Sequence, residues 1–413
     1  MSTNSTLIPR AWLTLVLLWF VVCFNFAARI MITTMHGSIV ETIPLTAAEF
    51  GLLTSVFLWV YSPLQPFAGF LADRFSRSRM ITWSMIAWSV MTFLTAYART
   101  FNELLVMRML MGASEALYMP AALALITDYH RGPTRSLAIG IHMTGVCVGC
   151  SLAGLGGWLA ELRSWNFAFR AVGLVGIAYS LLLLLTLRDA PRESDREIAG
   201  KITRSPPGFG VAFASLFSRR SFILMLVFYG LLGGVEWLTM GWMPVFFQGL
   251  FHLSQGAAGL SATGYLNMAA LLGVLIGGAW ADRWARTNER ARIWVPFLGL
   301  LIAGPGLWIL GQAGSYHFAI LGLMFFGLAE AFTPANLMPI ICLVTDARYR
   351  ATGFGLANFA NCVVGGLTIY ATGVMMDARV AFSTILSSAC GGVIFCAILL
   401  LFVKPTHSVR APG

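Results

Sequence analysis

Residues 69–74 of this chain read Gly-Phe-Leu-Ala-Asp-Arg, and residues 278–283 read Gly-Ala-Trp-Ala-Asp-Arg. Each hexapeptide follows an apolar stretch of about 20 residues, the length that a helix needs to cross a bilayer. A second echo links residues 112–116, Gly-Ala-Ser-Glu-Ala, to residues 327–331, Gly-Leu-Ala-Glu-Ala. Because both motifs recur in the same order, the chain is predicted to contain a duplicated unit of membrane helices.

The composition places this unit in a membrane. Hydrophobic residues make up 58% of the 413 residues and charged residues only 11%, whereas a soluble domain carries about 25% charged residues. We therefore predict an all-α integral membrane protein with twelve transmembrane helices in two pseudo-symmetric halves of six. The predicted boundaries are residues 1–187 for the N-terminal half, 188–220 for a cytoplasmic linker and 221–413 for the C-terminal half.

The basic residues predict the orientation. If both termini lie on one side, 21 of the 27 Lys and Arg residues fall in loops on that side. The opposite side receives four, which are Arg99, Arg163, Arg170 and Arg379. Cytoplasmic loops of membrane proteins are enriched in basic residues, so both termini are expected on the cytoplasmic side. The membrane is expected to be a bacterial inner (cytoplasmic) membrane. The same distribution explains the net charge of +10 without a nucleic-acid partner.

Two charges interrupt an otherwise apolar span. Arg108 and Glu115 are seven residues apart, which brings their side chains onto one helix face about 10 Å apart along the axis. A charge at the bilayer centre costs roughly 2.5–3.5 kcal/mol on insertion scales and usually faces a hydrated cavity or a partner. Such a cavity, with a fixed cation and a titratable carboxyl, is suited to bind and move an anion.

The loop of residues 69–79 resembles the signature loop of the major facilitator superfamily, although Ser76 stands where the family usually has Gly. The resemblance implies a latch that closes the cytoplasmic side in the outward-open state. Its predicted members are Asp73, Arg74 and Arg77, with Asp282 and Arg283 as the second copy. The alternative is that these charges only mark topology.

A narrower resemblance is to the anion:cation symporter branch, which includes bacterial sugar-acid transporters and sialin-type organic anion transporters. It depends on Arg29, Tyr61 and the spacing of Arg108 and Glu115. The branch implies that Arg29 grips a substrate carboxylate, that Tyr61 lines the cavity and that Glu115 titrates with coupled protons. Ala28 replaces an Asp that the branch often has, which weakens the case for proton coupling. Alternatively, Arg29 is structural and bound to backbone carbonyls or to Glu115.

The charges of these side chains predict a mechanism, and other polar residues within the spans are further candidates for the site. Arg29 stays charged at any working pH and can hold a carboxylate through two hydrogen bonds, whereas the charge of Glu115 can change. We expect protonation of Glu115 to release an Arg for the substrate anion. Further predicted site residues are Arg108, Asn358 and Asn361 for substrate, and Glu236 and Glu330 for coupled protons. Each of these Glu and Asn residues could instead form hydrogen bonds between helices.

The sequence therefore predicts a monomeric secondary transporter, a proton-coupled symporter of a sugar acid or other monocarboxylate, surrounded by lipid. The closest alternative is a spinster-like lysophospholipid transporter. A drug:proton antiporter and a non-transporting membrane sensor are less favoured. No nucleotide-binding loop, nucleophile motif or metal-ligand cluster occurs, so we expect no enzyme activity, no cofactor and no metal.

Overall fold

The computed structural model describes residues 4–130, 134–190, 209–288 and 290–404, and within these ranges the secondary structure is entirely helical. In the N-terminal half the helices are α1 (Asn4–Ile30), η1 (Met31–Met35), α2 (His36–Thr42), α3 (Ala47–Arg74), α4 (Arg77–Thr95), α5 (Phe101–Glu115), α6 (Tyr118–Tyr129), α7 (Arg135–Leu152), α8 (Leu155–Leu162) and α9 (Trp165–Thr186). In the C-terminal part they are α11 (Phe209–Phe217), α12 (Arg220–Phe251), α13 (Gln255–Leu260), η2 (Ser261–Tyr265), α14 (Leu266–Trp284), α15 (Ala291–Gly311), α16 (Tyr316–Glu330), α17 (Phe332–Val344), η3 (Ala347–Tyr349), α18 (Arg350–Asp377) and α19 (Phe382–Leu401).

Eleven helical stretches of the described chain are long and apolar enough to cross a membrane. The twelfth predicted span is α4, which has 19 residues but a more polar composition. Three of its threonine hydroxyls donate to backbone carbonyls one turn earlier, as Thr82 does to Ser78 O and Thr92 to Trp88 O, both at 2.8 Å. These bonds satisfy the threonine hydroxyls within the helix, and α4 packs in the bundle against α9 and α5.

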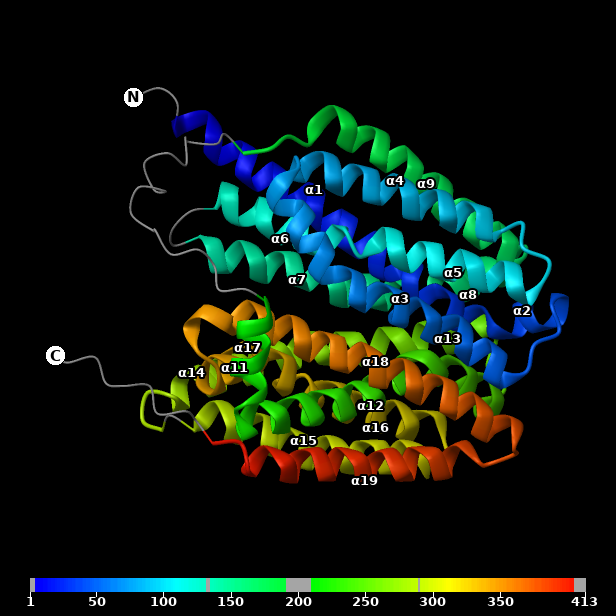
Figure 1. The fold of residues 1–413 in the computed structure, drawn as a ribbon. Coiled ribbons are helices and arrows are strands. Elements are labelled where there is room, and N and C mark those ends of the chain that lie inside the picture. The colour runs from blue at the N-terminus through cyan, green and yellow to red at the C-terminus, as the bar shows by residue number, and fades with distance from the viewer. Residues whose placement is uncertain (1–3, 131–133, 191–208, 289, 405–413) are drawn as a thin grey trace.

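The buried apolar side chains form two main clusters. One contains residues between 15 and 187 together with three residues of the C-terminal half, and the other contains residues between 216 and 403. Figure 1 shows the two corresponding bundles above one another, with α1 beginning and α19 ending at the same end of the molecule. We call this the terminal end and the other the distal end. Most of the predicted linker 188–220 lies outside the described residues, but its last part forms α11.

Two spans are broken at the same place in the repeat. Helix α5 ends at Glu115 and α16 ends at Glu330, and each is followed by a short helix, α6 or α17. Pro120 and Pro334 are each the third residue of that short helix. A proline cannot donate a backbone N–H and crowds the carbonyl four residues earlier, which explains a break at this point. Both acids therefore sit at an interruption inside a membrane span.

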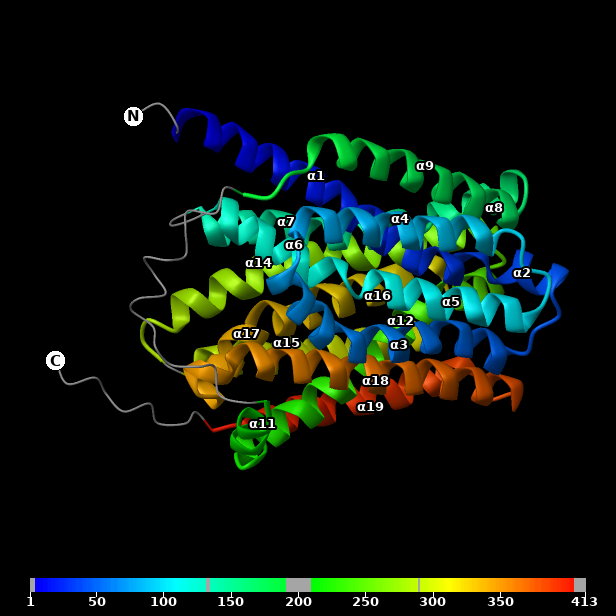
Figure 2. The ribbon, with the colours of Figure 1, turned by 45° about the horizontal axis from the view of Figure 1, so that its top comes forward.

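The halves contact each other along α3 and α18, which run side by side (Figure 2). At their distal ends the backbones approach so closely that a Cβ on Gly373 would lie 2.4 Å from Ala47 O. Between them, Ser55 Oγ donates to Gly366 O at 2.6 Å, and Trp59 Nε1 donates to Val363 O at 3.2 Å.

Two carboxylates join the halves at the distal end. Asp377, the last residue of α18, accepts hydrogen bonds from Ala47 N at 2.9 Å and Ala48 N at 2.8 Å, the first amides of α3. Glu161 of α8 accepts one at 2.7 Å from Gly256 N, at the start of α13. Helix N-termini carry unpaired amides and partial positive charge, which carboxylates satisfy. Each half thus caps a helix of the other half, in equivalent positions of the repeat.

Candidate functional site

The centre of the N-terminal half contains a buried ion pair between Arg29 and Glu115. Arg29 lies at the end of α1, where the helix changes to the 3₁₀ turn η1. Its Nη2 and Nε atoms donate to Glu115 Oε2 at 2.8 Å and 3.1 Å, and Nη2 also donates to Asn25 Oδ1 at 3.2 Å. The exposed fraction is 4% for Arg29 and 1% for Glu115. Glu115 Oε1 is buried and accepts no hydrogen bond of ordinary geometry from the described residues.

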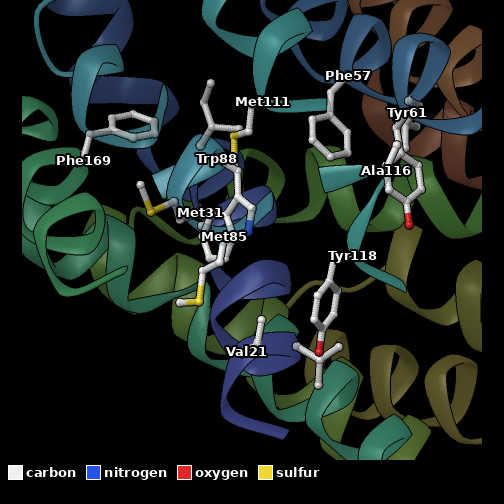
Figure 3. Close-up of a cluster of buried hydrophobic side chains, with 14 of the residues drawn as sticks. Val21, Met31, Phe57, Tyr61, Met85, Trp88, Met111, Ala116, Tyr118 and Phe169 are labelled. Atoms are coloured by element: carbon white, nitrogen blue, oxygen red, sulfur yellow. The ribbon is translucent and has the colours of Figure 1, made fainter. Parts of the chain in front are cut away.

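Three aromatic rings surround the Arg29 guanidinium. Its Cζ lies 4.4 Å from the ring centre of Phe26, 4.8 Å from that of Phe57 and 4.5 Å from that of Tyr61. Phe57 and Tyr61 are one turn apart on α3 and lie beside each other (Figure 3), with centres 5.6 Å apart. Cation–π contacts contribute about 0.5–2 kcal/mol each. The rings therefore hold the guanidinium in place without depending on the Glu115 charge.

The Arg108 guanidinium donates hydrogen bonds to backbone carbonyls of neighbouring helices. Its Nε donates to Leu53 O at 3.1 Å and its Nη2 donates to Arg29 O at 3.3 Å. The side chain is 1% exposed, and its Cζ lies 4.9 Å from the ring centre of Phe57. These bonds connect α5 to α3 and to the end of α1, so in this conformation Arg108 holds the backbone around Arg29. Its predicted contact with substrate stays a prediction.

A polar chain connects this centre to the C-terminal half. Gln65 Nε2 donates to Tyr61 Oη at 2.7 Å, and Asn358 Nδ2 donates to Gln65 Oε1 at 2.7 Å. Tyr61 in turn faces the Arg29 guanidinium. Two predicted site residues, Tyr61 and Asn358, are thus brought together through a glutamine between them.

The other two acids predicted to take up coupled protons, Glu236 and Glu330, lie in the C-terminal half. Asn361 Nδ2 donates to Glu236 Oε2 at 3.2 Å, and Asn361 Oδ1 accepts from Trp237 Nε1 at 3.0 Å. Glu330 is 8% exposed and makes no hydrogen bond or ion pair within the described part of the chain. Glu236 and Glu330 line the same cavity of about 670 Å³, to which both halves contribute.

This cavity does not include Arg29, Arg108 or Glu115 in its lining. Phe26 and Ile30, on either side of Arg29 in α1, do line it. Because the Phe26 ring also lies against the guanidinium, it stands between the cavity and the ion pair. The structure therefore contains two polar centres, one sealed and paired in the N-terminal half and one facing the cavity from the C-terminal half.

Three of the predicted latch residues contact groups of their own half. Arg77 pairs with Asp128, joining the start of α4 to α6, and Asp282 accepts from Arg292 Nη2 at 2.9 Å. The Arg74 guanidinium lies 4.1 Å from the Phe70 ring centre. Arg283 is exposed, and the side chain of Asp73 lies outside the described residues. Closure of the terminal end by these groups stays a prediction.

Two polar residues of the site were not among the predicted ones. Asn25 is four residues before Arg29, and Gln65 is four residues after Tyr61. Residues four apart share a helix face, so this spacing could have identified both. Phe26 is three residues before Arg29 and Phe57 is four before Tyr61, so the same rule places each ring on the face of a predicted site residue. That both rings meet at the Arg29 guanidinium depends on how α1 and α3 are rotated against each other.

Comparison with known proteins gives a consistent result. The family model described as Major Facilitator Superfamily matches residues 18–369. The chain is 26% identical to a probable sulfoacetate transporter of Cupriavidus necator, covering 93% of this chain and 91% of that one. It is 27% identical to the D-galactonate transporter of Escherichia coli O6:H1, covering 87% of each chain. A crystal structure of a bacterial homolog of the human lysosomal transporter Spinster, inward-facing and occupied, aligns with a TM-score of 0.78 at 24% identity, covering 96% and 95% of the two chains, which shows a shared fold.

Proposed function

This chain belongs to the Major Facilitator Superfamily, and we propose that it carries a small organic anion across the membrane by alternating access, coupled to protons. The observation that carries the proposal is the buried pair of Arg29 and Glu115. Relatives named for sulfoacetate and D-galactonate transport support the anionic cargo.

Coupling follows from competition for one guanidinium. While Glu115 is ionised, it occupies two of the Arg29 donors. When Glu115 takes up a proton it loses its charge, and the attraction that holds Arg29 to it falls sharply. The guanidinium then keeps its aromatic contacts and can bind a carboxylate or sulfonate instead. Phe26 must turn aside for an anion in the cavity to reach it.

Alternating access would use the contacts between the halves. Hydrogen bonds across the halves run from the Gln65–Asn358 bond to the caps formed by Asp377 and Glu161 at the distal end. With the termini in the cytoplasm, this arrangement is closed to the outside. Opening outward requires these bonds to break while the latch at the terminal end closes.

The test is uptake into proteoliposomes. We expect labelled D-galactonate or sulfoacetate to accumulate when an inward proton gradient is imposed, and Arg29→Ala to abolish uptake. Glu115→Gln should keep exchange of labelled for unlabelled substrate but lose accumulation driven by the pH gradient.

Glu103→Gln is the matched control, because Glu103 is on the same helix but exposed at its first turn. It should transport as the unchanged protein does. Accumulation that persists in Glu115→Gln would remove Glu115 from coupling. Uptake of neither anion, or uptake that persists in Arg29→Ala, would contradict the anion proposal.

One observation favours a second candidate, a transporter of lysophospholipids or similar amphiphiles. Apart from Glu236, Glu330 and a few small polar groups, the cavity is lined by apolar side chains such as Leu271, Val274 and Phe326. Such a wall suits an acyl chain. Transfer of a labelled lysophospholipid between vesicles, without uptake of either anion, would favour this candidate.

A further inference from the structure

The wall of the cavity formed by the C-terminal half carries two acidic side chains and no basic one among the described residues that line it. Glu236 and Glu330 both line the cavity, and no Lys or Arg is among the described residues that line it. Two carboxylates taken out of water without a countercharge are costly, so such a pair is stable only with a bound cation or proton.

The hydrogen bonds of these side chains show which of their oxygen atoms are available to bind a cation. Asn361 donates to Glu236 Oε2, which fixes that carboxyl and leaves its other oxygen without a hydrogen bond from the described residues. Glu330 is more than nine-tenths buried and has no hydrogen bond or ion pair within the described residues. Asn267 also lines the cavity, and because its Nδ2 donates to Thr263 O at 2.8 Å, its amide oxygen is the polar atom that remains.

We infer that Glu236 and Glu330 form a binding site for a single positive charge, either a protonated amine carried by the cargo or a sodium ion. The available atoms are oxygen acceptors, which bind ammonium groups and hard cations. No group of three or more acidic, His or Cys side chains suited to a metal occurs in the described chain, which favours one charge over a divalent ion. The inference rests on the proposed function in one respect, namely that the cargo crosses this cavity.

A cargo with an amine would be held at two poles. Its acid group would reach Arg29 in the N-terminal half, and its ammonium group would lie against Glu236 and Glu330. If the site takes sodium instead, the ion would offset one of the two negative charges of the ionised acids before an anion enters. In both cases the bound cation reduces the repulsion that an entering anion meets at this wall.

The test measures thermal unfolding of the purified full-length protein in detergent at alkaline pH, with ionic strength held constant by tetraethylammonium chloride. The probes are sodium chloride, 4-aminobutyrate and, as its matched acid without the amine, butyrate. A ligand that binds only the folded state raises the unfolding temperature. We expect a rise with sodium chloride or with 4-aminobutyrate, and none with butyrate. A rise with sodium alone identifies an ion site, and a rise with 4-aminobutyrate alone identifies an amine site.

Glu330→Gln should need at least about tenfold more of the effective probe, because a charge-assisted contact is lost. If Glu330→Gln folds poorly, the same probe titration on Glu236→Gln tests the inference independently. Glu41→Gln is the control, since Glu41 is exposed near the end of α2. No rise with either positive probe, or a rise unchanged in both cavity variants, overturns the inference.

The two proposals fail separately. D-galactonate binding that persists in Arg29→Ala counts against the proposed function, whereas a sodium or amine shift lost in Glu330→Gln stands whatever the anion result.

Discussion

The two halves of the molecule place a glutamate at the same break in a membrane helix but surround it differently. Glu115 ends α5 and is bound to Arg29 of α1. Glu330 ends α16, and α12, the counterpart of α1 in the second half, brings Glu236 to the same cavity. The repeat has thus kept the break in the helix, while the charged residue supplied by the first span of each half is a cation in one half and an acid in the other. Equivalent positions of the two halves therefore differ in their surroundings, because Glu115 forms a buried ion pair and Glu330 faces the cavity.

The largest effect should come from removing the cation of the paired half. Arg29→Ala leaves the Glu115 carboxylate buried without its partner, which costs about 3–5 kcal/mol for a broken buried ion pair. Equilibrium unfolding in detergent would measure this loss. Adding Glu115→Gln to Arg29→Ala should recover much of the lost stability, because the uncompensated charge disappears. A double variant no more stable than Arg29→Ala would mean that Arg29 stabilises the fold mainly through its aromatic contacts.

Neutralising each glutamate in turn tests the comparison directly. Glu115→Gln should lower the free energy of unfolding by about 1.5–3 kcal/mol, the range for a lost hydrogen bond to a charged group. Glu330→Gln should be neutral or stabilising at alkaline pH, since Glu330 has no partner to lose. Both variants are compared in the same unfolding experiment. Equal losses would show that the two acids are held alike.

Removing either helix cap at the distal end should have a smaller effect, and the two removals should have similar effects. Asp377→Asn and Glu161→Gln should each cost about 0.5–2 kcal/mol of the distal contact, the range for a lost helix cap. The expected result is greater labelling, by a membrane-impermeant reagent, of a cysteine introduced at Ser38, which is half-buried against Gln255 of the other half. Glu41→Gln, three residues later in the chain, serves as the control. If only one of the two substitutions increased labelling, the caps would not be equivalent.

The smallest effect is expected at Asp346, the residue of the second half that corresponds to Asp128 in the repeat. Asp128 pairs with Arg77 on another helix, whereas Asp346 pairs with Arg348 two residues away, at 3.0 Å. Hydrogen bonds from Arg348 lower the pKa of Asp346. A lowered pKa in the folded state adds stability above the ordinary carboxyl pKa, and that stability is lost as the pH falls through the lowered value.

Because Arg348 is exposed and Asp346 is partly exposed, solvent screens their ion pair, and Asp346→Asn should leave the unfolding temperature almost unchanged at neutral pH. The difference from the unchanged protein should shrink further below about pH 4, where an ordinary Asp is protonated. A large loss at neutral pH would show that Asp346 acts beyond its local turn.

The fold could be predicted largely from the sequence, because hydropathy, the duplicated motifs and the loop at 69–79 all depend on local patterns. The site could be predicted only in part. Arg108 and Glu115 share a helix face by spacing, yet the ion pair forms between Glu115 and Arg29, 86 residues apart. That choice depends on how α1, α3 and α5 are rotated in the bundle, which no spacing within one helix determines. The separation of the cavity from Arg29 by Phe26 depends on the same rotations.

The reciprocal caps have a consequence for how abruptly the distal end can open. Asp377 and Glu161 lie on opposite halves, and each reaches across to a helix of the other. A rigid tilt that moves the distal ends of the two halves apart stretches both contacts, because both join the halves at that end. Hydrogen bonds act only over a few tenths of an ångström, so their release falls within a narrow range of tilt angles. Partly parted intermediates of the distal end are therefore disfavoured.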